Sequence, residues 1–226
     1  MEKIDKVQRI INKFYYNLFI EFNSNQVIDF DFSDHMRWDL INEILKRKNI
    51  NSYLEIGCDD NLLFDRIKIE NKIGVDPRQG GNIKKTSDEF FKGNEKKFDL
   101  IFIDGLHEFE QVNKDIENSL KSLNNNGMIL LHDCLPRKMD VQAVPRYRHH
   151  WTGDVWKSIV KFRHYHDLTI QTILMDMGIG VIQKSKNLNP LSLKINDFKK
   201  LKFKDFVKNH KIYMNEISYI NFINNL

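Results

Sequence analysis

FDLIFIDGLHEFEQVNKDIENSLKSLNNNGMILLHD, residues 98–133, is the stretch of sequence that decides the fold. It opens with a nearly continuous apolar run, Phe98–Asp104, which is typical of a strand covered on both faces of a sheet. From Phe109 to Leu123 an apolar residue recurs every three or four positions, which predicts an amphipathic helix. Residues 124–127, NNNG, end that helix, and residues 128–133 are the next predicted strand. The order strand, helix, strand indicates a parallel α/β sheet.

On the N-terminal side of this stretch, apolar periodicity predicts two strands and three helices. They are a helix over 4–19, a helix capped by Ser33 or Asp34 and running to Leu45, a strand over 53–56, a helix around 61–67 and a strand over 72–76. Arg37 and Trp38, before the first strand, either fold over a site as a lid or pack the second helix.

On the C-terminal side, Thr152 is predicted to cap a helix that runs to Phe162. Two strand-like runs follow at residues 168–175 and 179–183. Their tight connection through Asp176-Met177-Gly178 predicts an antiparallel hairpin that closes the edge of the sheet. Residues 194–226 are predicted to be helical.

The length and composition predict one compact domain. Within it we expect an N-terminal helical segment over residues 1–50, a core over 51–185 and a C-terminal helical extension over 186–226. No apolar run approaches the roughly 20 residues that span a bilayer, and the N-terminus does not resemble a secretory signal. Two cysteines make no disulfide framework, and they form no structural zinc site. These features predict a cytoplasmic protein without membrane insertion.

The net charge of +4 is unevenly distributed along the chain. From Lys184 onward nine lysines stand against three acids, which gives +6, so the first 183 residues sum to −2. A basic tail could bind nucleic acid or an anionic membrane. Because no aromatic-interleaved basic repeat accompanies it, we interpret the tail as a solvated helix face and expect no nucleic-acid partner.

Polar residues gather where the predicted parallel strands end. They are Glu55 and Gly57, Asp76, Asp104, and the pair His132 and Asp133. In an open α/β sheet the ligand lies beyond the carboxyl ends of the strands, so these residues are the candidate site. The acid at 76 follows the acid at 55 by 21 residues, a separation that suits hydrogen bonds from two ribose hydroxyls.

That separation fits both a dinucleotide and S-adenosylmethionine (SAM). The loop Gly57-Cys58-Asp59-Asp60-Asn61 lacks the G-x-G-x-x-G glycines that admit a pyrophosphate. Its acids would repel phosphates, yet they suit the cationic amino and sulfonium groups of SAM. An NAD-dependent oxidoreductase or epimerase therefore stays an alternative, as does a non-catalytic module that binds SAM.

Six segments resemble a bacterial class I SAM-dependent methyltransferase family of the methyltransferase-24 type. They are YLEIGCDDNLLFDRI, KIGVDP, TSDEFF, FDLIFIDGLHEFEQVNKDI, GMILLHDCLP and WTGDVWKSIVKFR. The resemblance runs from about Arg37 to Gln183. It implies a Rossmann-like, seven-stranded, mainly parallel sheet with an antiparallel last strand. Members are often associated with surface-polysaccharide or sugar modification.

The resemblance also implies a set of cofactor-binding residues. Glu55, Gly57 and Cys58 would line the methionine part of SAM. Asp76 would hold the ribose, with Pro77 beside it in the same set. The adenine would lie against Ser87 and Asp88, and the sulfonium side against Asp104, Gly105 and Leu106.

For the chemistry, His107 is the first candidate for a base that accepts a hydroxyl proton, because its reference pKa is near neutral. Asp133 is a second candidate catalytic residue, and His132 is predicted to orient Asp133. More distantly, the chain resembles metal-dependent small-molecule O-methyltransferases, in which Asp104 and Asp133 match magnesium ligands. The third position here is Cys134, and magnesium prefers oxygen, so a metal is possible but not favoured.

The expected reaction is O-methylation of a sugar, a sugar nucleotide or a surface-glycan precursor. His149 and His150, beside Arg146 and Arg148, either bind an anionic group of the substrate or lie in a solvated loop. Trp151 and Trp156 either stack on a sugar ring or pack in the core. A homo-oligomer is possible.

Overall fold

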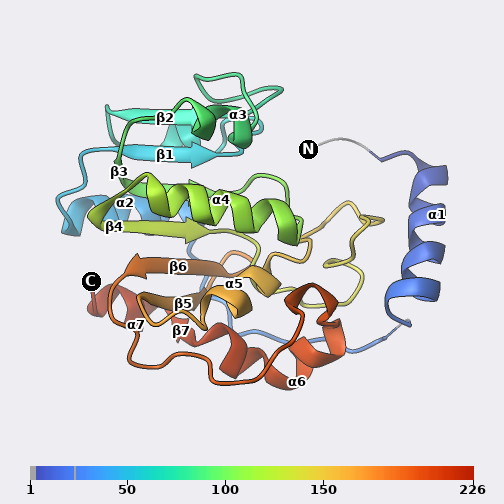
Figure 1. The fold of residues 1–226 in the computed structure, drawn as a ribbon. Helices are drawn as coiled ribbons and strands as arrows, with labels where there is room; N and C mark the ends of the chain where they lie inside the picture. The colour runs from blue at the N-terminus through green and yellow to red at the C-terminus, as the bar shows by residue number, and fades with distance from the viewer. Residues whose placement is uncertain (1–3, 23) are drawn as a thin grey trace.

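The computed structural model describes residues 4–22 and 24–226. Its centre is a seven-stranded sheet in the order β2-β1-β3-β4-β6-β5-β7. The strands are β1 (Tyr53–Ile56), β2 (Lys72–Val75), β3 (Phe98–Ile103), β4 (Leu123–Leu131), β5 (Leu168–Leu174), β6 (Ile179–Lys184) and β7 (Glu216–Ser218). Only β6 runs antiparallel to its neighbours. The predicted seven-stranded, mainly parallel sheet with one antiparallel strand is confirmed (Figure 1).

The position of the antiparallel strand differs from the prediction. β6 lies inside the sheet, between β4 and β5, because the tight turn after β5 returns the chain along the side of β5 that faces β4. The other side of β5 is covered by β7, which comes from the C-terminal extension and pairs in parallel. The C-terminal extension therefore supplies the edge strand as well as helices.

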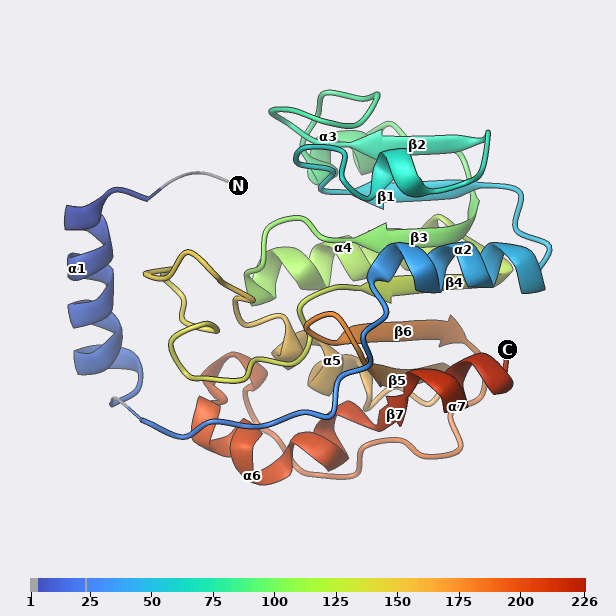
Figure 2. The ribbon, with the colours of Figure 1, turned by 180° about the vertical axis from the view of Figure 1, so that it is seen from behind.

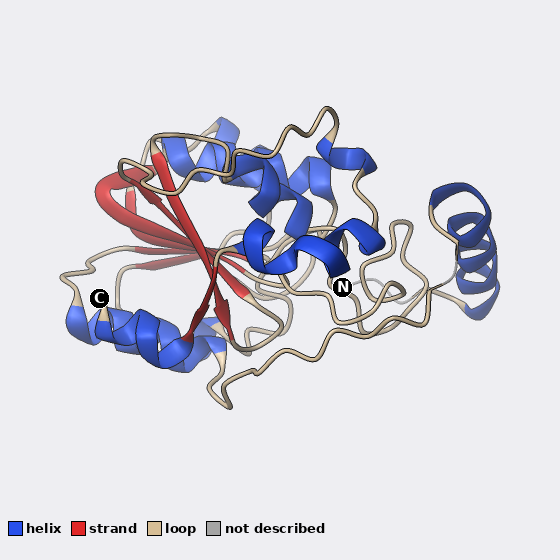
Figure 3. Cartoon of the chain, turned by 90° about the horizontal axis from the view of Figure 1, so that it is seen from below, coloured by secondary structure: helices blue, strands red, loops and turns tan. Residues whose placement is uncertain are grey.

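Helices cover both faces of the sheet (Figure 3). On one face pack α4 (Phe109–Lys121), α5 (Trp156–Phe162) and α6 (Phe203–Met214), and on the other α2 (Arg37–Arg47) and α7 (Tyr219–Asn224) (Figures 1 and 2). Successive side chains of a strand point to opposite faces. In β3 the fully buried Ile101 packs on the α4 side and Phe102 on the α2 side, so the strand is apolar on both faces, apart from Asp99 near its start.

Four local predictions are wrong: two helix starts, one short helix and one helix end. α2 is capped by Met36 and Asp39, not by Ser33 or Asp34. α5 begins at Trp156, and the hydroxyl of Thr152 instead contacts the carbonyl of Val141. The helix expected over 61–67 is a single 3-10 turn, η2 (Phe64–Arg66), and residues 124–127 belong to β4.

The shortened helix after β1 has a local cause. Asn61 adopts a positive φ of 67°, which a helix does not accept. Its side-chain oxygen accepts a 2.6 Å hydrogen bond from the amide of Gly81 in the loop after β2. The chain is therefore tied to that loop where a helix would have to begin.

The N-terminal helix is present as α1 (Lys6–Tyr15), continued by a π-helical turn, η1 (Tyr16–Ile20). An amphipathic helix usually buries its apolar stripe, but here the stripe is exposed, with Val7 at 67% and Phe14 at 68%. The polar side faces the molecule, where the amide of Asn12 donates to the carbonyl of Arg146 at 2.7 Å. Figures 1 and 2 show α1 standing apart from the sheet, beside the loop that follows β4. Among the described residues, no helix has both the length and the apolar content to cross a bilayer.

Candidate functional site

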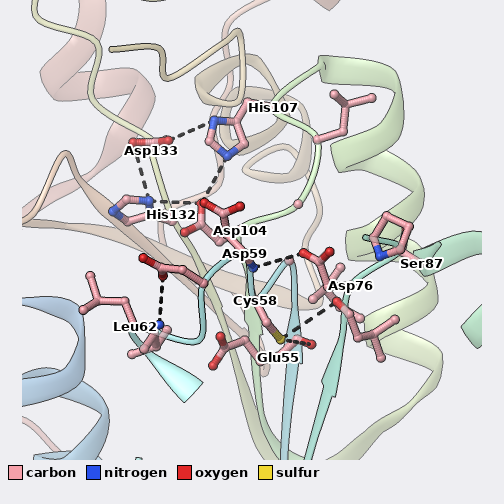
Figure 4. Close-up of a pocket in the computed structure, with 18 of the residues that line it drawn as sticks. Glu55, Cys58, Asp59, Leu62, Asp76, Ser87, Asp104, His107, His132 and Asp133 are labelled. Carbon is pink, nitrogen blue, oxygen red and sulfur yellow. Dashed lines mark hydrogen bonds and ion pairs between the residues drawn. The ribbon is translucent and has the colours of Figure 1, made fainter. Parts of the chain in front are cut away.

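A cavity of about 940 Å³ opens at the carboxyl edge of the parallel strands. Every site residue predicted from the sequence lines it: Glu55, Gly57, Cys58, Asp76, Pro77, Ser87, Asp88, Asp104, Gly105, Leu106, His107, His132 and Asp133. Figure 4 shows many of these side chains converging from the ends of neighbouring strands. We refer to this cavity as the central pocket.

Glu55 is buried at the end of β1 with one carboxylate oxygen unmatched. The hydroxyl of Tyr53 donates to Oε2 at 2.7 Å, whereas Oε1 is buried and has no hydrogen-bond partner among the described residues. Burial raises the pKa of Glu55 from 4.5 to about 7. A buried, unpartnered carboxylate oxygen in a cavity wall fits a ligand that brings a cationic N–H donor, such as the amino group of SAM.

Backbone geometry brings the loops of neighbouring strands together around this point. Gly57 has a φ of 87°, and a Cβ there would lie 2.2 Å from the carbonyl oxygen of Asp104, so only glycine fits. After β2, the carboxylate of Asp76 accepts hydrogen bonds from the amides of Asp59, Arg78 and Gln79 at 2.9–3.0 Å. These backbone bonds fix the Asp76 carboxylate at the pocket wall.

Ser87 and Asp88 form the first turn of α3 (Ser87–Lys92). Both accept hydrogen bonds from the side chain of Gln111 on α4, at 3.2 and 3.0 Å. The sequence analysis missed Gln111, since a polar residue in the first turn of a helix carries no signal of its own. Of the two cysteines, Cys58 lines the pocket and Cys134 does not; both are buried, and burial raises the pKa of each thiol.

His107 lies between two carboxylates (Figure 4). Its Nε2 is 3.1 Å from Asp104 Oδ1, and its Nδ1 is 3.0 Å from Asp133 Oδ2. Carboxylates only accept hydrogen bonds, so both ring nitrogens carry protons. Burial alone would lower the pKa of His107, but the charges of Asp133 and Asp104 outweigh it and raise this pKa to about 10. The prediction that His107 is poised near neutrality therefore does not hold in this environment.

The position of His107 is set by the segment that precedes α5. Gly153 has a φ of 58°, and a Cβ there would collide with the carbonyl of His107 at 1.7 Å. The ring of Trp151 stacks on the imidazole, with centroids 5.4 Å apart and planes 18° apart. Trp156, in contrast, is fully buried and belongs to the core.

His132 contacts both carboxylates that hold His107. Its Nδ1 is 3.2 Å from Asp104 Oδ1 and 3.5 Å from Asp133 Oδ1. Burial opposes a charge on His132, yet the acids around it raise its pKa well above the ordinary value. Its Nε2 lies between the donor Nη1 of Arg37 at 3.0 Å and the acceptor Oδ1 of Asp176 at 3.4 Å.

Asp176 completes the cluster, and the sequence analysis did not select it. Its carboxylate is 3.0 Å from Arg37 Nη1 and 3.4 Å from His132 Nε2. Because β6 is antiparallel to both neighbours, β5 is parallel to β4 and ends at the same edge of the sheet. The turn after β5 therefore reaches the pocket. Arg37, anchored by Asp176, is part of the pocket wall.

The cluster offers metal-binding donors but does not fit magnesium. Asp104, His107 and Asp133 have donor atoms within 4.8 Å of one another. One of the three is a nitrogen, whereas magnesium prefers oxygen ligands. Both nitrogens of His107 already carry protons, Nε2 toward Asp104 and Nδ1 toward Asp133 and the carbonyl of Trp151. The position expected to supply the third ligand, Cys134, has its buried thiol 3.2 Å from the carbonyl of Leu131.

The four residues of the predicted anion-binding cluster, Arg146, Arg148, His149 and His150, do not line one common site in the structure. Arg146 donates to the carbonyls of Arg148 and His149, and its guanidinium lies 5.4 Å from the ring centroid of Trp151. Arg148 is paired with Asp140. Of the four residues, only His149 and His150 line the central pocket.

Comparison with known proteins agrees with this geometry. Residues 69–134, from the approach to β2 to the end of β4, match the family Methyltransf_24, described as a methyltransferase domain. No curated protein matches the sequence.

Solved structures share the fold over most of the chain. An SAH-bound methyltransferase of Podospora anserina, PaMTH1, is 15% identical with a TM-score of 0.52, and the match covers 82% of this chain and 99% of that one. A putative caffeoyl-CoA O-methyltransferase of Staphylococcus aureus is 17% identical with a TM-score of 0.50, covering 80% and 93%. A putative O-methyltransferase of Klebsiella pneumoniae is 12% identical with a TM-score of 0.51, covering 82% and 92%. The chain therefore has the class I methyltransferase fold.

Proposed function

We propose that this protein is a SAM-dependent O-methyltransferase. The observation that carries the proposal is the acidic wall of the central pocket, where Glu55, Asp76 and Asp104 end three adjacent parallel strands. The same edge that would receive a pyrophosphate in a dinucleotide-binding fold here presents carboxylates, which repel phosphates and attract the two cationic groups of SAM. The methyltransferase-domain match over residues 69–134 supports the same conclusion.

The proposed cofactor contacts follow the order of the strands. Glu55 accepts from the amino group, next to Gly57 and Cys58, and Asp76 accepts from the ribose hydroxyls beside Pro77. Ser87 and Asp88 face the adenine. Asp104, Gly105 and Leu106 lie toward the sulfonium. Each assignment rests on position in the pocket together with the family resemblance.

When bound, SAM supplies a methyl group on a sulfonium leaving group. During transfer the sulfur–methyl bond breaks and the oxygen–methyl bond forms, and the acceptor hydroxyl loses its proton. We propose that this proton passes to the cluster of Asp104, His107 and Asp133. Because both nitrogens of His107 are protonated, the proton of the hydroxyl passes to a carboxylate oxygen, most directly one of Asp133. His107 holds the two carboxylates in place. His132 orients the pair from the opposite side.

We propose that the reaction does not need a metal ion. Protonated His107 already bridges the two carboxylates that a cation would otherwise join, and the neighbouring Arg37 adds a second positive charge. Activity should therefore survive treatment with EDTA. A rise of more than tenfold on adding Mg²⁺ or Mn²⁺ to treated enzyme would contradict this part of the proposal.

The acceptor is proposed to be a small polar molecule with a hydroxyl group, such as a sugar or sugar nucleotide used in surface-polysaccharide biosynthesis. The family association in the resemblance supports the sugar, and the polar mouth of the pocket at His149 and His150 is compatible with it. Fold alone does not select a substrate.

Thermal denaturation with S-adenosylhomocysteine (SAH), and with NAD as control, tests the proposal first. SAH at 100 times its Kd should add about 2.7 kcal/mol, which corresponds to about 5–10 °C in Tm for a chain of this size. A shift with NAD and none with SAH would select the oxidoreductase alternative. If SAH binds but Asp133→Ala and His107→Ala leave the function of the protein unaltered, it is a non-catalytic SAM-binding module.

A further inference from the structure

A second cavity, of about 580 Å³, lies between α1 and the loop that follows β4. Its walls carry five basic side chains and one acid: Lys6, Arg9, Lys13, Lys138, Arg148 and Asp140. We refer to it as the basic cavity. His149 and His150 line both this cavity and the central pocket, so the two adjoin.

Within the part of the chain that the structure describes, the basic charge of this cavity is not neutralised. The acid Asp140 is held by Arg148, with Nε at 2.6 Å and Nη2 at 2.5 Å from the same carboxylate oxygen. Within residues 4–22 and 24–226, no acid lies within ion-pair distance of Lys6, Arg9, Lys13 or Lys138. The Nε of Arg9 is buried and has no hydrogen-bond partner among these residues.

The orientation of α1 indicates that its basic residues are more than a solvent-exposed face of a helix. Lys6, Arg9 and Lys13 recur at three- and four-residue spacing and so share one side of the helix. Contacts on the polar side hold the helix against the loop: Asn12 donates to the carbonyl of Arg146, and Tyr16 OH accepts from Gln142 at 2.8 Å. The basic residues of α1 thereby line the cavity, while the apolar stripe is left outside.

We propose that the basic cavity binds the phosphate groups of the acceptor, which places the substrate among phosphorylated sugars and nucleotide-linked sugars. Guanidinium and ammonium groups bind phosphate by charge-assisted hydrogen bonds, and a cleft lined by one sign of charge concentrates ligands of the opposite sign. The volume is sufficient for a diphosphate. This inference rests on the proposed function, since the hydroxyl of the same molecule must reach Asp133 in the adjoining pocket.

Titration calorimetry with inorganic pyrophosphate tests the cavity directly, with Arg9→Gln/Lys13→Gln as the test variant. Lys208→Gln/Lys211→Gln is the matched control, because it removes the same charge from exposed positions of α6 that line neither cavity. We expect the test variant to bind pyrophosphate at least tenfold more weakly than the wild type and the control to stay within twofold. SAH affinity, measured in parallel, should be unchanged in both variants, which also shows that both are folded.

The outcomes separate this inference from the proposed function. Suppose that SAH binds, and that pyrophosphate binds wild type and test variant equally or binds neither of them. The basic cavity is then not a phosphate site, and the proposed function stands. If folded protein does not bind SAH, the proposed function fails whatever pyrophosphate does.

Methyl transfer to matched acceptors then identifies the class. A phosphorylated sugar and a nucleotide-linked sugar are compared with the corresponding free sugar. The inference is supported if methyl transfer to a phosphorylated form is at least tenfold faster than to the free sugar and if this advantage is lost in the test variant. The faster of the two phosphorylated forms then identifies the source of the phosphate. Equal rates of methyl transfer to all three acceptors would overturn the inference. Tighter binding of a single-stranded nucleic acid than of pyrophosphate at the basic cavity would overturn it as well.

Discussion

Replacing Glu55 with glutamine should stabilise the ligand-free protein at pH 8, have a much smaller effect on its stability at pH 5 and weaken SAH binding. The carboxylate is buried, and one of its oxygens has no partner among the described residues. Burial raises its pKa from 4.5 to about 7, so ionising it in the folded state is costly. Glutamine keeps the shape and still accepts from the hydroxyl of Tyr53, but it has no charge to desolvate.

The magnitude and the pH window follow from linkage. An acid whose folded pKa is raised contributes stability that is fully present below its unfolded pKa and is lost as pH rises through its folded pKa. For Glu55 that window runs from 4.5 to about 7. The rise of this pKa from 4.5 to about 7, at about 1.4 kcal/mol per pKa unit, gives an upper bound of about 3.5 kcal/mol above the window. This corresponds to about 7–14 °C in Tm for a chain of this size.

The assay is thermal denaturation of wild type and Glu55→Gln between pH 5 and pH 8, with and without SAH. Glu70→Gln serves as control, because this carboxylate is exposed. Without ligand, the difference in Tm between Glu55→Gln and wild type should be small at pH 5, just inside this window, and grow through pH 7. With SAH at pH 8, the variant should gain less, because a charge-assisted hydrogen bond of about 1.5–3 kcal/mol is lost.

Two results would refute this reasoning separately. A Tm difference that is the same at pH 5 and pH 8 would mean that the Glu55 carboxylate is not desolvated in the folded protein. An unchanged SAH affinity in Glu55→Gln would mean that the unpartnered oxygen does not face the amino group of the cofactor, whatever the pH dependence.

Three further predictions test the catalytic cluster, the core and the N-terminal segment. His107→Gln should lower methyl transfer by about 100-fold or more while SAH affinity, measured by calorimetry, stays within a few fold; an equal loss of both would assign His107 to cofactor binding. Trp156→Ala should cost about 3–5 kcal/mol in denaturant unfolding, because the side chain is fully buried and its indole N–H donates to Gln142; a loss below 1 kcal/mol would contradict its place in the core. Glu21→Ala should cost about 1–2 kcal/mol and expose the segment before α2 to protease, because the Glu21 carboxylate caps the first amides of α6; unchanged proteolysis would show that this cap does not hold the segment.

The parallel part of the sheet could be predicted because its information is local. Phe98–Ile103 is apolar on both faces and α4 repeats its apolar residues at helical spacing, so each element carries its own pattern. β7 could not be predicted in the same way. Glu216–Ser218 is three residues long, and it becomes a strand only because β5 offers an open edge there.

The same distinction applies to the site. Glu55, Asp76 and Asp104 could be predicted because each directly follows or ends a recognisable parallel strand. Asp176 was missed since its strand was interpreted as one arm of an edge hairpin, which hid the fact that β5 also ends at the ligand edge. The protonation of His107 depends on two carboxylates that come from different strands, so no local pattern contains it.

The two adjoining cavities have opposite charge, and under the proposed function this arrangement would sort two substrates of opposite charge. In the central pocket the carboxylates of Asp104, Asp133 and Asp176 lie together beside the place proposed for the sulfonium, with His107 and Arg37 among them. A phosphorylated acceptor would be repelled from the carboxylates of this pocket and attracted to the basic cavity on the other side of His149 and His150. Each substrate would thereby be excluded from the other's position, and the acceptor hydroxyl would be directed toward the methyl group from the side of the basic cavity.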